Sequence, residues 1–187
     1  MSVELEREFT FLMNSLPDDL DQFPSKIIED NFIPAESDHP VIRIRRNGDQ
    51  LVITKKYPKN SIDGVGGDSS HMVEHTIELS PNEYAALNQL PGKRFKKRRF
   101  AYEIGDLMAE VDIYLDDLAG LVVIDFEFDS DEAMAAFQKP DFIGPDVTQD
   151  SLVAGGMLCG KKYADIADQL LERYDYRPVA GIEKYGE

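Results

Sequence analysis

Glutamate occupies every second position near the start of this chain, as Glu4, Glu6 and Glu8. In a β-strand, residues two apart lie on the same face, so these three carboxylates point one way and their neighbours the other. Carboxylate oxygens are ligands that Mg²⁺ and Mn²⁺ prefer. The opening segment therefore predicts a strand whose polar face binds a divalent cation.

Arginine and lysine follow the same spacing farther along the chain. Arg43 and Arg45 alternate with isoleucine, and Lys97 and Arg99 lie two residues apart. Guanidinium groups hold phosphate oxygens through paired hydrogen bonds, and a lysine ammonium binds them as a point charge. These pairs predict a surface that binds an anion.

The apolar run 122–128 contains two carboxylates, Asp125 and Glu127. A run this apolar indicates burial on at least one face, and buried carboxylates need cations nearby. Pooling the strands gives nine acids and five bases on one face. Metal cations would relieve this acidic excess while the bases hold an anion bridged to the metal. The predicted charged face comprises Glu4, Glu6, Glu8, Arg43, Arg45, Lys55, Glu74, Glu78, Lys97, Arg99, Glu110, Asp112, Asp125 and Glu127.

The elements that must position these residues are mainly strands. Alternation of polar and apolar residues predicts about eight strands between Val3 and Phe128. Asn47-Gly48-Asp49, Gly105-Asp106 and the segment 117–120 are turn signals between them. The strands are expected at about 3–9, 27–33, 42–45, 51–56, 72–79, 94–102, 108–115 and 121–128.

Helices are predicted at three places. Ser80 caps a short helix that begins at Pro81, and Asp129-Ser130 precedes a second at about 131–138. The segment 161–174 carries apolar residues at helical spacing, so we expect an amphipathic helix that packs against the rest of the molecule. The glycine-rich segment 61–70 is predicted to be a flexible loop.

Together these elements predict one domain over residues 1–187, mainly β (α+β), with barrel strands over about 3–128 and a helical part over about 129–187. We expect a closed eight-stranded antiparallel β-barrel with a charged interior and apolar side chains facing outward against flanking helices and loops. The alternative is a sheet whose charged face is solvated and rich in salt bridges.

Composition narrows the classes of partner. A net charge of −16 argues against binding to duplex nucleic acid or to an anionic membrane, because phosphate groups would repel such a surface. The single cysteine, Cys159, cannot form an internal disulfide, and the chain has neither a signal-peptide pattern nor an apolar run of membrane-spanning length. A cytoplasmic protein is expected.

At these residues the chain resembles the CYTH superfamily of triphosphate tunnel metalloenzymes. The family's mark is a Glu-x-Glu-x-Lys strand, followed by basic pairs and carboxylates on successive strands of an eight-stranded tunnel. Glu4 and Glu6 fit the first two motif positions, whereas the family's lysine is Glu8 here and the arginine of the central strand is Met72. The remaining positions are matched by Arg43, Arg45, Lys55, Glu74, Lys97, Arg99, Glu110, Asp112, Asp125 and Glu127.

The resemblance implies divalent-metal-dependent hydrolysis of a triphosphate, with inorganic tripolyphosphate as the expected substrate and Mg²⁺ or Mn²⁺ as the cofactor. A thiamine-triphosphatase-like activity belongs to the same family. Two alternatives stay open: a weak or inactive module that binds polyphosphate or nucleotide, and adenylate-cyclase-like chemistry on ATP. Whether the molecule is a monomer or a homodimer is also open.

The resemblance further implies a role for each residue of the charged face. It assigns catalysis to Glu4, Glu6 and Glu127; phosphate binding to Arg43, Arg45, Lys55, Lys97 and Arg99; and metal binding to Glu4, Glu6, Glu110, Asp112, Asp125 and Glu127, with Glu8, Glu74 and Glu78 as further tunnel-facing residues.

Overall fold

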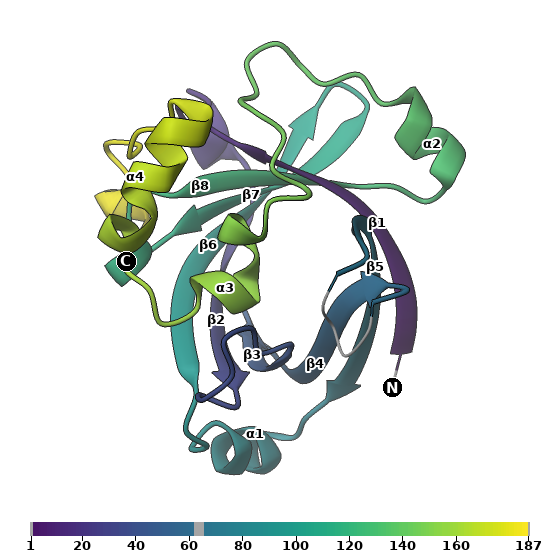
Figure 1. Ribbon diagram of the computed structural model, residues 1–187, viewed down its shortest axis with the longest axis vertical. Helices are drawn as coiled ribbons and strands as arrows, with labels where there is room; N and C mark the ends of the chain where they lie inside the picture. The colour runs from purple at the N-terminus through teal and green to yellow at the C-terminus, as the bar shows by residue number, and fades with distance from the viewer. Residues whose placement is uncertain (1, 62–65, 187) are drawn as a thin grey trace.

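The computed structural model describes residues 2–61 and 66–186. Within these residues, eight antiparallel strands close into a barrel in the order β1-β5-β4-β3-β2-β6-β7-β8 (Figure 1). The predicted barrel is therefore confirmed. Its strands are β1 (Ser2–Leu12), β2 (Ser25–Ile33), β3 (Ile42–Asn47), β4 (Gln50–Lys59), β5 (Asp68–Glu78), β6 (Lys93–Ile104), β7 (Leu107–Tyr114) and β8 (Val122–Glu127).

The first strand closes the barrel because it pairs with two neighbours in succession. Its residues 2–7 pair with β5, and its residues 8–12 pair with β8. The turns fall where they were predicted, with positive φ at Gly48 (61°) between β3 and β4 and at Gly105 (60°) between β6 and β7. The predicted loop 61–70 is partly wrong, because β5 already begins at Asp68; residues 62–65 lie outside the described residues.

The hydrophobic core lies outside the barrel wall. Outward-facing residues of β7 and β8 such as Val111, Ile113 and Ile124 have no solvent exposure. The C-terminal part of the chain covers them, and Ile166 and Leu170 of the last helix are equally buried. Outward apolar packing, as predicted, is thus confirmed for this side of the barrel.

The helices are α1 (Pro81–Leu87), α2 (Asp131–Ala136), α3 (Gly155–Leu158) and α4 (Tyr163–Tyr174). Ser80 and Ser130 cap α1 and α2 as predicted, each accepting a hydrogen bond from the backbone N–H three residues later. Single turns of 3₁₀-helix form at Leu20–Gln22 (η1), Asp116–Leu118 (η2), Ser151–Val153 (η3) and Glu183–Gly186 (η4). None of the helices formed by the described residues is long and apolar enough to cross a membrane.

The segment that leads from α2 to α3 returns to the barrel. Val147 donates a backbone hydrogen bond to Thr10 of β1, and α3 then lies in front of the ring of strands (Figure 1). A Cβ atom at Gly156 would lie 2.4 Å from the His39 ring and 2.5 Å from the Pro40 carbonyl oxygen. Glycine at this position therefore allows α3 to sit against the β2–β3 connection.

Candidate active site

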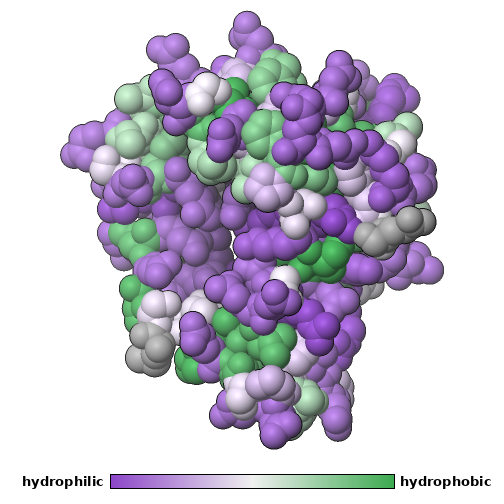
Figure 2. Space-filling view, turned by 180° about the vertical axis from the view of Figure 1, so that it is seen from behind, coloured by the Kyte–Doolittle hydropathy of each residue, from purple (hydrophilic) through white to green (hydrophobic). Residues whose placement is uncertain are grey.

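The barrel encloses a cavity of about 640 Å³. Seen from behind, the molecule is hollowed near its centre, and hydrophilic side chains surround the hollow (Figure 2). Among the described residues, eight carboxylates and five basic side chains line the cavity, so its lining carries three more negative than positive charges. The carboxylates are Glu6, Glu8, Glu74, Glu110, Asp112, Asp125, Glu127 and Asp150, and the bases are Arg43, Arg45, Lys56, Lys97 and Arg99.

One wall of the cavity is a buried ion-pair network centred on Asp112 of β7. The Asp112 side chain has no solvent exposure, and its two oxygens accept hydrogen bonds from Arg99 Nε (2.7 Å) and Nη2 (2.6 Å). Lys97 donates to the same carboxylate, and Arg99 also pairs with Glu110. Burial alone would raise the pKa of Asp112, but Arg99 and Lys97 hold it well below its usual range.

A second pair of cations lies on β3. Arg45 binds the buried Asp30 of β2 through two hydrogen bonds of 2.7 and 2.9 Å. Arg43 donates from Nη2 to Glu74 at 2.9 Å. Its Nε is buried and has no hydrogen-bond partner within the part of the chain that the structure describes. Arg43 therefore retains a donor that a bound anion can use.

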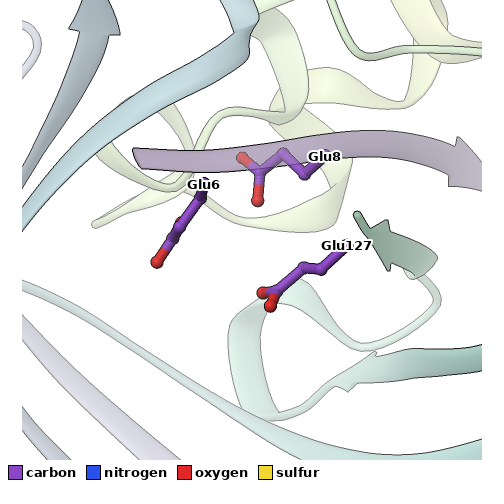
Figure 3. Close-up of side chains that lie close together, drawn as sticks. All are labelled: Glu6, Glu8 and Glu127. Carbon is purple, nitrogen blue, oxygen red and sulfur yellow. The ribbon is translucent and has the colours of Figure 1, made fainter. Parts of the chain in front are cut away.

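A third cluster lies where β1 meets β8, and it is acidic (Figure 3). Glu6, Glu8 and Glu127 each offer a carboxylate oxygen, and these oxygens lie within 4.8 Å of one another. Glu8 and Glu127 face each other directly across the β1–β8 pairing, where two like charges destabilise a sheet. Lys56 of β4 supplies the nearby positive charge, with its Nζ 2.5 Å from Glu6 and 2.8 Å from Glu8. We call Glu6, Glu8 and Glu127 the carboxylate corner.

Carboxylates around this corner resist ionisation. Partial removal from water, and then the charges of Glu110 and Glu6, raise the pKa of Glu127 to about 7. Burial and the charge of Asp112 likewise raise the pKa of Asp125 to about 7. Burial also raises the pKa of Glu6 above its usual value. A cation that bound here would stabilise the ionised forms.

The carboxylate corner fits a divalent metal ion. Its donors are hard carboxylate oxygens, which Mg²⁺ and Mn²⁺ prefer. The Lys56 ammonium already occupies a position between two of them, which shows that the corner accommodates positive charge. The ligands most suited to hold the ion are therefore Glu6, Glu8 and Glu127.

Three predicted site residues lie outside the cavity. Glu4 and Glu78 are on the inward face by register but are exposed near the strand ends, where the barrel opens. Lys55 is exposed on the outer face, with its ammonium 5.5 Å from the Tyr57 ring. Placing Lys55 in the tunnel was wrong, whereas Glu4 and Glu78 have the expected inward parity and their part in the site stays a prediction. The other predicted site residues, Glu6, Glu8, Arg43, Arg45, Glu74, Lys97, Arg99, Glu110, Asp112, Asp125 and Glu127, all line it.

The structure also separates the six predicted metal ligands. Asp112 is enclosed by Arg99 and Lys97, so its oxygens are already occupied. Glu110 is paired with Arg99 as well, and Asp125 accepts a hydrogen bond from Thr10 (2.7 Å). Of the six, Glu6 and Glu127 meet in the corner, and Glu8 replaces Glu4 as their neighbour.

Sequence reasoning missed Lys56 and Asp30. Strand alternation could have identified Lys56. Residues two apart share a face of β4, so if Ile53 faces outward, Thr54 and Lys56 face inward. Asp30 gave a weaker signal than Asp125, because strand 27–33 carries two adjacent carboxylates, Glu29 and Asp30, and only their parity with Ile28 and Phe32 separates them.

Comparisons with known proteins agree with this geometry. An inorganic triphosphatase from Nitrosomonas europaea is 27% identical over 150 residues, which cover 79% of this chain and 90% of that protein. A solved structure of an inorganic triphosphatase covers 83% of this chain and 95% of its own, with 21% identity and a TM-score of 0.58. A candidate adenylate cyclase from Bacillus halodurans covers 100% of both chains, with 13% identity and a TM-score of 0.52. At such identities the two structures show a shared fold, and no family model matches the sequence.

Proposed function

We propose that the chain is a member of the CYTH superfamily of triphosphate tunnel metalloenzymes and that it hydrolyses inorganic tripolyphosphate with the help of Mg²⁺ or Mn²⁺. The observation that carries this proposal is the juxtaposition, in one cavity, of the carboxylate corner and the arginine pair of β3. Carboxylates suit the metal, and guanidinium groups suit phosphate oxygens. The activity of the Nitrosomonas europaea relative supports the same substrate.

In the proposed reaction, the cavity bases bind the phosphate chain. Arg43, whose Nε has no partner among the described residues, and Arg45 are the main contacts in this proposal, whereas Lys97 and Arg99 are already paired with Asp112. A bound divalent cation supplies positive charge at the phosphate and makes water a stronger nucleophile. The water oxygen bonds to the terminal phosphorus, the bridging P–O bond breaks, and diphosphate and orthophosphate leave.

Glu127 is suited to take up the proton of the attacking water. Its carboxylate would be ionised beside a bound cation, and the oxygen that does not face the ion would be able to accept the proton. Its neighbours in the corner, Glu6 and Glu8, would hold the cation by their carboxylates. The substrate is thus a small molecule, and the acidic surface and single buried cysteine support a cytoplasmic setting without nucleic-acid or membrane partners.

Glu6→Gln tests the proposal. The change keeps the side-chain shape but weakens one ligand, so metal-dependent phosphate release from tripolyphosphate should fall by about 100-fold or more. Thermal melting should stay close to that of the wild type. Assays with tripolyphosphate, ATP and thiamine triphosphate, each with Mg²⁺ and Mn²⁺, define the preferred substrate. Unchanged turnover in Glu6→Gln would refute the assignment.

A second candidate function is binding of polyphosphate or nucleotide without efficient turnover. Glu8 and Met72 favour it, because both line the cavity where the family has cations. Calorimetric titration with tripolyphosphate and Mg²⁺, run beside the phosphate-release assay, separates the two functions. Binding without release would select the second.

A further inference from the structure

Lys56 holds the position that a divalent cation needs. Its Nζ lies 2.5 Å from Glu6 Oε2 and 2.8 Å from Glu8 Oε2, and the three side chains are each less than one-fifth exposed. A lysine ammonium is charged at neutral pH, and the two glutamates beside it are its counter-charges.

A metal ion and this ammonium cannot share the same oxygens. Carboxylate oxygens coordinate Mg²⁺ at about 2.0–2.1 Å, so an ion held by Glu6 and Glu8 would lie well within contact distance of Nζ in its present place. Two positive charges at such separation repel strongly in a partly buried site. One cation must leave for the other to enter.

The surroundings of Lys56 offer it a place to go. Arg43, whose Nε has no hydrogen-bond partner in the described parts of the chain, is paired with Glu74, and Glu74 faces Lys56 directly across the β4–β5 pairing. The lysine side chain is a flexible chain of four carbons, so a change of rotamer can move its ammonium group by several ångströms. From the corner, the ammonium can swing towards Arg43, where the proposed phosphate chain binds.

We propose that Lys56 occupies the divalent-cation position of the carboxylate corner in the metal-free protein and is displaced by the metal towards Arg43, where it becomes a phosphate ligand. Entry of the metal ion then frees the Lys56 ammonium to donate hydrogen bonds to phosphate. Binding of the metal ion and binding of the triphosphate therefore strengthen each other. The displacement stands on the corner alone; the phosphate role rests on the proposed function.

The first test measures metal binding without any phosphate. Calorimetric titration with Mn²⁺ should give an affinity for Lys56→Met that is higher than the wild-type affinity by on the order of tenfold, because the competing ammonium is gone. Lys56→Gln, which keeps a hydrogen-bond donor near Glu8, provides a second variant should the methionine disturb folding. Lys55→Met is the matched control, since it removes the same charge from the outer face of the same strand, and its affinity should equal that of the wild type. Equal Mn²⁺ affinities in all four proteins would overturn the proposal.

A second measurement separates displacement from simple charge repulsion. A crystal structure with Mn²⁺ should show Lys56 Nζ outside hydrogen-bond distance of Glu6 and Glu8; an ammonium still between them beside the bound metal would overturn the proposal. With a non-hydrolysable imido analogue of tripolyphosphate, Mn²⁺ should tighten binding less in Lys56→Met than in the wild type. Displacement without phosphate release from tripolyphosphate would refute the proposed hydrolysis and leave the exchange of cations standing.

Discussion

The Asp112 network and the carboxylate corner both combine carboxylates with basic side chains but differ in charge balance. Asp112 is fully buried and receives hydrogen bonds from two cations, Arg99 and Lys97. The corner has three carboxylates and one ammonium, and Glu127 keeps contact with solvent. The first arrangement is satisfied within the protein, whereas the second has a charge excess that a ligand can satisfy. We therefore read the first as a rigid support and the second as the reactive region.

The largest expected effect separates the two regions by stability. Asp112→Asn leaves Lys97 and Arg99 buried without their carboxylate, so the free energy of unfolding should fall by about 3–5 kcal/mol. Glu127→Gln removes one of several repelling carboxylates, which is ionised at a cost to the native state at pH 7.5, so this variant should be at least as stable as the wild type. Urea unfolding of both variants at pH 7.5 without metal measures the contrast. Equal losses of unfolding free energy in the two variants would contradict the distinction between the Asp112 network as a support and the carboxylate corner as the reactive region.

The next prediction concerns metal stabilisation of the corner. At 100 times its dissociation constant, a ligand of the native state adds about 2.7 kcal/mol to stability. Mg²⁺ should therefore raise the melting temperature of the wild type by several degrees, and much less in Glu8→Gln. Glu4→Gln is the control, since Glu4 is exposed and does not line the cavity. A larger loss in Glu4→Gln than in Glu8→Gln would return the metal to the site inferred from the motif.

A smaller effect follows from the pKa of Asp125. This carboxyl has a pKa of about 7 in the folded protein and near 4 when unfolded, so it is ionised at a cost to the native state above pH 7. Its contribution to the stability of the metal-free protein should thus fall as the pH rises from about 5 to 8. Relative to Asp125→Asn, the wild type should lose about 2.5 kcal/mol over that range. A difference in unfolding free energy that does not vary with pH would contradict the raised pKa.

The smallest expected effect belongs to Glu78. Its side chain is exposed at the end of β5 and lies outside the cavity. Glu78→Gln should leave both phosphate release and the free energy of unfolding unchanged, the latter within about 0.5 kcal/mol. Chemical denaturation and a steady-state assay check this. A marked loss of phosphate release would mean that the functional cavity extends to this end of the barrel.

Strand alternation predicted most of the fold and most of the cavity lining. The period of two is local, so it identified the strands, their turns and the inward residues Arg43, Arg45, Lys97 and Arg99. It failed at Lys55. Lys55 and Lys56 are adjacent, so only one of them can face the interior, and the alternation along β4 shows that it is Lys56. It could not reveal Lys56 as the partner of Glu6 and Glu8, because that contact joins residues about fifty positions apart.

By itself, the sequence determined strands with one apolar and one charged face, and the carboxylates inside the apolar run 122–128 favoured a buried charged face with counter-charges over a solvated one. It did not determine which charges meet. The tertiary structure decided that, since barrel closure sets β1 opposite β8 and so brings Glu8 to Glu127, while Glu4 falls at the open end. No local pattern encodes this long-range strand register. It places some acidic residues in the carboxylate corner, which can bind a cation, and others in the Asp112 network, where Lys97 and Arg99 already neutralise them.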